Sequence, residues 1–222
     1  MSEKLTEKVR RVEAKLAERY GRPEWAGPGD PLDELMLTIL SQNTSDVNRD
    51  KGFRQLKERF PTWNQTAAAD VGELEAAIAP AGLSKQKAPR MLAVLHDIER
   101  QFGELSLGEL ENWPSDRVKA FLTSYPGVGP KTAACVLMFA MGRPVMPVDT
   151  HVYRIAGRLG LLPPKASYEE AHDSLERITP PELVYPFHIE MIRHGRALCR
   201  PTNPKCPDCP VRDDCDYYNG RR

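Results

Sequence analysis

A short glycine turn between two helical segments constrains the fold of this chain more than any other feature. The turn, residues 126–129 with the sequence PGVG, is followed at once by Lys131 and by an apolar run over 133–141. Two glycines allow another backbone to approach closely where side chains would obstruct it. The start of the second helix also offers free backbone N–H groups, which suit a phosphate. We therefore predict a helix, a glycine hairpin and a second helix, with an anion site at the turn.

Two charged residues beside this turn are candidates for chemistry. Lys131 falls in the first turn of the predicted second helix, where the positive end of the helix dipole disfavours its charge. It could anchor a phosphate or act as an amine nucleophile, and both uses fit this position. Asp149 precedes a helical pattern over 150–159, where an ordinary N-cap is the simpler explanation. His151, two residues further on, has the simpler explanation of a packed or surface histidine.

Composition sets only broad limits. The 222 residues can bury a core as one large or two small domains. No apolar run reaches the length of a membrane span, and the N-terminus alternates charge without an apolar signal core, so we expect a cytoplasmic protein. The net charge of zero does not announce a nucleic-acid binder, although residues 121–165 carry five basic residues against one aspartate. That surplus fits a solvated helix face as well as a DNA-facing strip.

Hydrophobic periodicity predicts an all-α fold of many short helices, with no strand pattern and no repeat of fixed period. Asp30 and Pro31 have the types expected at an N-cap and a first helical position. Pro89 is expected in the first turn of its helix, where a missing N–H costs little. The polar segment 41–46 reads as an interhelical loop. The predicted helices cover residues 5–20, 31–40, 46–60, 67–69, 71–79, 87–102, 115–123, 131–141, 150–159, 168–178 and 182–198.

Four of the five cysteines lie in the last 24 residues with the spacing C-x6-C-x2-C-x5-C, at Cys199, Cys206, Cys209 and Cys215. In an intracellular chain such clustering argues for metal ligation over disulfides. Structural zinc sites usually pair two close-spaced knuckles, whereas this spacing has one close pair and two broader intervals. The spacing favours a four-iron cluster, which needs thiolates further apart, and keeps zinc as the alternative. Cys135, inside the apolar run, is predicted to be a buried core thiol.

The hairpin with Lys131, the segment 148–151 and the cysteine spacing together resemble endonuclease III, the iron–sulfur DNA glycosylase of the helix–hairpin–helix superfamily. The resemblance extends from about residue 32 to residue 215. It implies two helical domains with a DNA cleft between them. One would be a six-helix barrel over 29–143 that contains the helix–hairpin–helix at about 114–142. The other, the iron–sulfur domain, would combine 1–28 with 144–222.

The resemblance also implies roles for individual residues. Lys131 matches the catalytic lysine and Asp149 the catalytic aspartate, and the four clustered cysteines match the ligands of a [4Fe–4S] cluster. Tyr125 stands where a leucine is common, which we expect to alter hairpin packing but not chemistry. Residues matched to DNA contacts lie in the hairpin and in two other loops: Gly127, Val128, Gly129, Leu83 and Asn43. His151, close to Asp149 in the sequence, is a further candidate for a DNA contact or for a contact to a catalytic residue, with a packed or surface histidine as the simpler explanation.

Two of these positions would act inside the duplex. Leu83 would wedge between bases, and Asn43 would fill the gap left by the extruded nucleotide. Many family members have glutamine at the gap-filling position, and this chain has Gln42 next to Asn43, so either amide could serve.

The implied function is a bifunctional DNA N-glycosylase and abasic-site lyase for oxidised pyrimidines. It would work through a Schiff base and β-elimination, as a monomer on double-stranded DNA with damaged bases or abasic sites. Two alternatives remain. A monofunctional mismatch-specific glycosylase is one, although such relatives generally lack the lysine and carry an extra C-terminal domain. A non-catalytic DNA-binding module with an iron–sulfur or zinc loop is the other.

Overall fold

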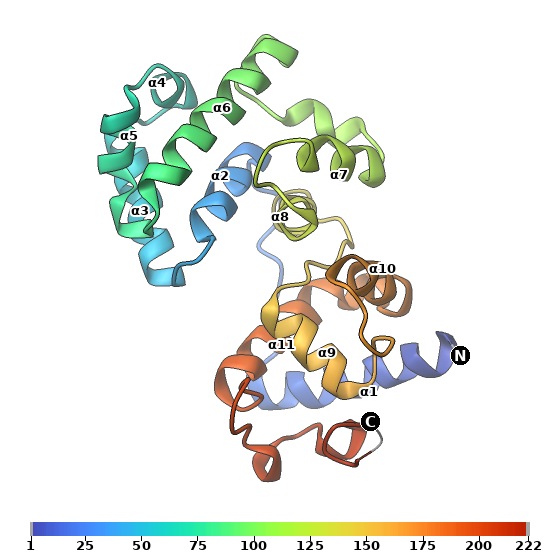
Figure 1. Ribbon diagram of the computed structural model, residues 1–222. Coiled ribbons are helices and arrows are strands. Elements are labelled where there is room, and N and C mark those ends of the chain that lie inside the picture. Colours follow the sequence, from blue (N-terminus) through green and yellow to red (C-terminus); the bar gives the residue numbers. More distant parts are fainter. Residues whose placement is uncertain (1, 221–222) are drawn as a thin grey trace. The chain divides into compact units, whose positions relative to one another are not determined.

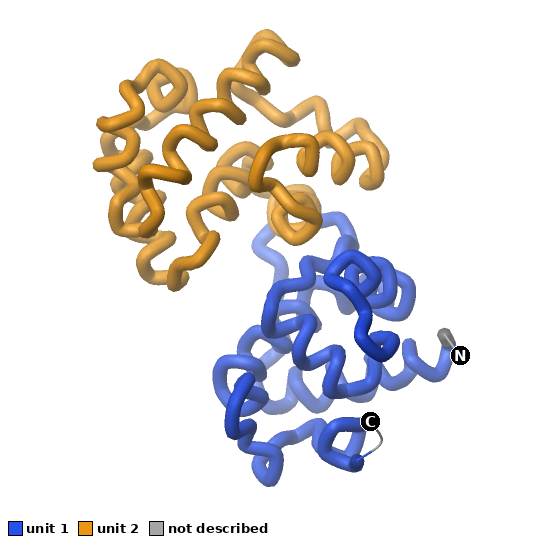
Figure 2. The backbone as a smooth tube through the Cα atoms, viewed as in Figure 1, with its two compact units in different colours: residues 1–27, 142–222 blue, residues 28–141 orange. Residues whose placement is uncertain are grey.

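The computed structural model describes residues 2–220, and within this range it contains helices and no strand (Figure 1). The chain divides into two compact units: residues 28–141, and residues 1–27 together with 142–222 (Figure 2). The sequence had placed these divisions after residues 28 and 143. None of the described helices is long and apolar enough to cross a membrane.

The unit of residues 28–141 carries the predicted hairpin. Its core surrounds the helix α2, whose leucine, isoleucine and methionine side chains, except that of Leu37, are fully buried. Each such side chain contributes about 1.5–3 kcal/mol to folding. The elements in chain order are α2 (Pro31–Ser41), α3 (Asp46–Arg59), α4 (Trp63–Ala67), α5 (Val71–Ala77), η1 (Ala79–Ala81), α6 (Ser84–Phe102), η2 (Gly108–Asn112), α7 (Ser115–Thr123), α8 (Pro130–Cys135) and the π-helical turn η3 (Val136–Ala140).

The unit of residues 1–27 and 142–222 packs its N-terminal helix against helices from the end of the chain. The amphipathic α1 lies against α10 and α11, and α11 also packs on α9. The elements in chain order are α1 (Ser2–Tyr20), α9 (Thr150–Leu159), α10 (Tyr168–Ile178), η4 (Pro181–Leu183), α11 (Val184–Ala197), η5 (Cys206–Asp208) and η6 (Arg212–Asp214).

Several predicted helix ends are confirmed because their caps are local. Asp30 accepts hydrogen bonds from the backbone N–H of Leu32 at 2.7 Å and of Asp33 at 3.3 Å, and Pro31 is the first residue of α2. The predicted range 168–178 matches α10, which opens with a capping box between Ser167 and Glu170.

Two predicted boundaries are wrong. The helix predicted over 87–102 begins at Ser84, because the carbonyl of Leu83 accepts bonds from the N–H groups of Gln86 and Lys87. Pro89 consequently lies inside the helix and not in its first turn. The helix predicted over 67–69 is instead Trp63–Ala67, opened by a capping box between residues 62 and 65.

A carboxyl group is buried without a hydrogen-bond partner in the described part of the unit of residues 1–27 and 142–222. Glu190 of α11 is fully buried, and among the described residues neither side-chain oxygen has a hydrogen-bond partner. Burial, together with the charge of nearby Glu13, raises the pKa of Glu190 to about 8. The buried side chain is therefore a neutral acid at neutral pH.

Glu190→Gln should make stability less dependent on pH. The folded protein keeps the Glu190 proton up to a pKa of about 8, whereas the unfolded chain loses it near 4.5. Stability at this site is therefore full below about pH 4.5 and falls by up to about 1.4 kcal/mol per pH unit as the pH rises toward 8. Urea unfolding midpoints at several pH values in this window should show the variant gaining on the wild type as the pH rises. The exposed Glu18→Gln is the matched control, and a variant that follows the wild-type pH profile would contradict the prediction.

Candidate active site

The glycine turn forms the predicted hairpin between α7 and α8. The carbonyl of Tyr125 accepts a bond from the N–H of Val128 at 3.0 Å, which closes the turn. Gly129 precedes α8 without a side-chain cap, so the helix start keeps N–H groups that no side chain satisfies. The side chain of Val128 is buried. A ligand at this turn would consequently meet backbone and not side chains.

The two hairpin glycines are needed for different reasons. Gly127 has φ of 80°, and a Cβ there would lie 2.3 Å from Cζ of Arg90. Gly129 has an ordinary φ of −98°, and an added Cβ would meet nothing within 4 Å. Neither backbone conformation nor packing within the described residues demands a glycine at 129. The open space there is available to a partner that approaches the backbone closely.

Tyr125 packs into the unit behind the hairpin. Its ring lies edge-on to Phe121 at 5.4 Å between centroids and is 5% exposed. Burial raises the pKa of Tyr125 to about 12. The phenol is therefore a neutral part of the aromatic packing that supports the turn.

Lys131 occupies the first turn of α8 and is half-buried. Across residues 2–220 no hydrogen bond or ion pair engages its ammonium. The charge of Lys131 interacts with the carboxylate of Glu34 on α2. Burial raises the pKa of Glu34, while a hydrogen bond from Thr38 and attraction to Lys131 lower it. Sequence reasoning missed Glu34, because its position on a largely apolar helix gives no sign that it faces the hairpin helix.

Asp149 caps α9, as the simpler explanation of its position predicted. Its Oδ1 accepts a bond from the N–H of Val152 at 2.7 Å. Within the described part of the chain no hydrogen bond uses Oδ2. His151 follows in the first turn of α9, where its Nδ1 lies 3.0 Å from Nη2 of Arg154. A Cβ added at Gly195 of α11 would lie 2.5 Å from the same Nδ1. The imidazole is thus packed between α9 and α11.

The two residues predicted to enter the duplex share an unusual backbone conformation. Asn43 has φ of 53° and Leu83 has φ of 52°, in the left-handed region that side-chain-bearing residues rarely adopt. Both are exposed, and the leucine side chain keeps 45% of its surface in solvent. Strained, exposed residues of this kind cluster at ligand-binding loops.

Gln42, by contrast, has its amide engaged within the unit. Its Nε2 donates to the carbonyl of Gly127 at 2.9 Å, and its Oε1 accepts from Nη1 of Arg90 at 2.8 Å. Arg90 was not singled out in the sequence, because nothing local marks an arginine on α6 as a neighbour of the hairpin.

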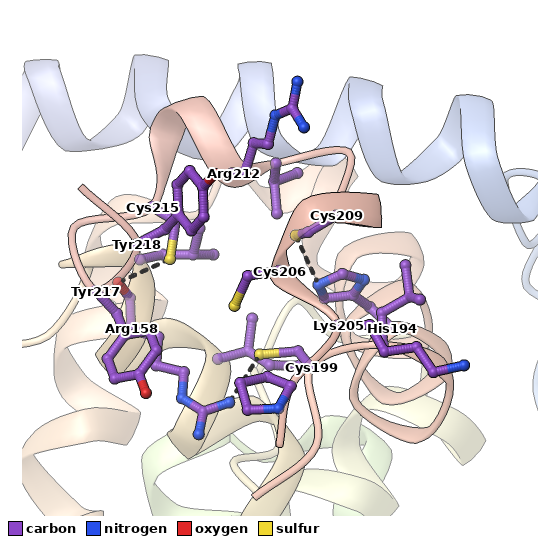
Figure 3. Close-up of a pocket in the computed structure, with 15 residues that line it drawn as sticks. Arg158, His194, Cys199, Lys205, Cys206, Cys209, Arg212, Cys215, Tyr217 and Tyr218 are labelled. Atoms are coloured by element: carbon purple, nitrogen blue, oxygen red, sulfur yellow. Dashed lines mark hydrogen bonds between the residues drawn. The ribbon is translucent and has the colours of Figure 1, made fainter. Parts of the chain in front are cut away.

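The four clustered cysteines are free thiols that line one pocket formed by the segment after α11 and by α9 (Figure 3). Nη1 of Arg158 donates to Sγ of Cys199 at 3.3 Å, and Nε2 of His194 lies 3.5 Å from Sγ of Cys209. Burial raises the pKa of Cys209 to about 11. Cys135 is buried in the other unit, as predicted.

The thiols around this pocket have the chemistry to hold a metal cluster. Among residues 2–220 no three His, Cys, Asp or Glu side chains gather as the ligands of one metal ion would. Four thiols spaced around a shared pocket suit a group whose corners each take one thiolate. The apolar lining, with one guanidinium directed at a sulfur, suits a buried group with thiolate ligands.

Comparison with known proteins decides the family. Residues 36–181 match the model of the HhH-GPD superfamily of base excision DNA repair proteins. Endonuclease III of Thermotoga maritima is 34% identical over 192 residues, which cover 86% of this chain and 85% of that protein. The chain belongs to the endonuclease III family. Endonuclease III of Escherichia coli (strain K12) is 33% identical over 190 residues, or 84% of each chain.

Solved structures agree with this assignment. The structure of a trapped covalent intermediate between an endonuclease III and DNA superimposes with a TM-score of 0.81 at 29% identity, over 97% of this chain and 98% of that one. The endonuclease III family member described here is accordingly an all-helical base-excision-repair DNA glycosylase that binds DNA. The family implies an iron–sulfur cluster, which the cysteine pocket fits.

Proposed function

We propose that this glycosylase is bifunctional: it removes oxidised pyrimidines and then cleaves the strand at the abasic site. The observation that carries the proposal is the unpaired amine of Lys131, in the first helical turn behind the glycine hairpin. A lysine held in an ion pair would be a poor nucleophile, and none of the described residues pairs with this one. Membership of the endonuclease III family supports the same reading.

The substrate base must first leave the stacked duplex, which costs a few kcal/mol. In the proposed complex the free N–H groups at the hairpin hold a phosphate and fix the register without reading sequence. Leu83 wedges into the stack, and Asn43 bonds to the partner base left behind. The exposed, left-handed loop positions of both residues support these roles.

The proposed chemistry uses the amine of Lys131 and the carboxylate of Asp149 on the everted nucleotide. Nζ of Lys131 attacks C1′, the bond to the base breaks, and the base leaves with the bonding electrons and takes up a proton. Opening of the sugar ring gives a protonated imine between Nζ and C1′. The imine acidifies C2′, and loss of the C2′ proton expels the 3′ phosphate by β-elimination. In this proposal Asp149 uses its uncapped oxygen to accept the lysine proton or to stabilise the cationic sugar.

The four cysteine thiolates would hold a [4Fe–4S] cluster, which would supply structural cross-linking of the segment 199–215. Arg158 would donate to the thiolate of Cys199, as it does to the thiol. The segment held in this way carries the basic residues Arg200, Lys205 and Arg212, which suit a DNA backbone. We propose that the protein acts as a monomer in the cytoplasm, at the nucleoid if the source is bacterial.

Single-lesion duplexes test the proposal. A duplex with one thymine glycol should be nicked at the lesion, and sodium borohydride should trap a covalent protein–DNA adduct by reducing the imine. Release of the base without nicking or trapping would instead indicate the monofunctional alternative. Equal affinity for all duplexes with no base release would indicate the non-catalytic one.

A further inference from the structure

Gln42 has both ends of its amide occupied. Its nitrogen donates to the carbonyl of Gly127 in the hairpin, and its oxygen accepts from the guanidinium of Arg90 on α6. An orphaned base would have to compete with these bonds for the donor and the acceptor of this amide. Gln42 is therefore built into the protein, whereas the neighbouring Asn43 is exposed.

Arg90 fills the space that Gly127 leaves open. A Cβ on Gly127 would fall 2.3 Å from Cζ and 2.5 Å from both Nε and Nη1 of Arg90. The positive φ of Gly127 and the absence of its side chain thus allow the guanidinium to lie against the hairpin turn. Through Gln42 the same guanidinium also reaches the loop that presents Asn43.

A second side chain of α6 binds the backbone where the loops of Asn43 and Leu83 begin. Lys87, one turn before Arg90, is 1% exposed, and its Nζ donates to the carbonyls of Leu40 at 2.7 Å and of Ala81 at 2.9 Å. These carbonyls end α2 and η1, directly before the loops of Asn43 and Leu83. One helix therefore fixes all three segments proposed to touch DNA.

We propose that Arg90 and Gln42 are positioning residues that form a bridge between the hairpin and the Asn43 loop. The bridge sets the separation between the hairpin N–H groups and the Asn43 amide. A phosphate held at the hairpin then places the gap of the everted nucleotide at Asn43. Gln42 acts only through this bridge and does not fill the gap. This inference rests on the DNA contacts of the proposed function.

Gln42→Met, Arg90→Met and the double variant test the bridge, with the exposed Arg54→Met as a control that removes one positive charge from the same unit. Loss of a charge-assisted hydrogen bond predicts about tenfold to hundredfold slower single-turnover excision for each single variant. Because both act through one bridge, the double variant should be at most about threefold slower than either single variant. Circular dichroism and thermal unfolding establish that each variant is folded.

A fluorescent 2-aminopurine opposite an uncleavable abasic analogue reports insertion at the gap without any chemistry. Both single variants should lose the same part of this signal, and the slope of log affinity against log salt should match the wild type. If Arg90 were instead a phosphate contact, Arg90→Met alone would lower that slope by about one, and the two single effects would multiply. Either outcome overturns the bridge. Failure of the wild type to nick or be trapped would overturn the proposed chemistry, while the fluorescence and salt measurements would still decide the bridge.

Discussion

Lys131→Gln should abolish the borohydride-trapped adduct and slow base excision by about 10³-fold or more, because no other group at this position can form the imine. Folding should be unaffected, since the ammonium is half-buried and makes no hydrogen bond or ion pair with the described residues. Single-turnover excision, adduct formation and thermal unfolding measure the three expectations.

Asp149→Asn is the informative companion. Asparagine caps helices as well as aspartate does, so α9 should keep its N-terminal bond to Val152 and the unfolding temperature should change little. Excision should nevertheless fall by about 10²–10⁴-fold if the carboxylate handles a proton or a cationic sugar. Wild-type turnover by Lys131→Gln would remove the lysine from the mechanism, and full turnover by Asp149→Asn would restrict the aspartate to capping.

Replacing one cysteine of the pocket should have the largest effect on stability. Cys209→Ser should lose the iron of the cluster and lower the unfolding midpoint strongly, because binding energy at such a site is also folding energy. Without the cluster the four thiols lose their common ligand. The segment after α11 then keeps its contacts to α1 and α9, such as the ion pair of Lys8 with Asp216 and the bond from Arg158 to the carbonyl of Arg200.

Cys135→Ala is the matched control, because it removes a buried thiol from the other unit. It should keep its iron and sulfide and cost only about 1 kcal/mol, as small core truncations do. Metal and acid-labile sulfide analysis of the purified chains, with the brown absorbance, gives the answer. A colourless wild type with one zinc per chain would establish the alternative metal.

The fold was largely predictable because its signals are local. Caps such as Asp30 and the Ser167–Glu170 box lie within one helical turn of the ends they define, and the sequence contains them whole. The wrongly predicted start of α6 depends on a backbone conformation and not on a residue pattern. Nothing in the residue type of Leu83 announces a left-handed φ, which starts α6 early and leaves Pro89 inside it.

The candidate site likewise has a part that the sequence predicts and a part that it does not. The four thiols are close in sequence, and their gathering around one pocket could be predicted from spacing. The bridge joins Gln42 to Arg90, 48 positions away, and to Gly127, 85 positions away, so no local sequence pattern encodes it. The unpartnered burial of Glu190 is likewise set by packing between helices from opposite ends of the sequence.

The left-handed backbone at Leu83 limits how this loop can evolve. A β-branched residue is a severe outlier at such a φ, so valine or isoleucine would have to reshape the turn before reaching the same place. Side chains that are not branched at Cβ adopt this φ at a lower steric cost. The side chain at position 83 can therefore vary in length and polarity during evolution, whereas the β-branched residues valine and isoleucine are excluded there.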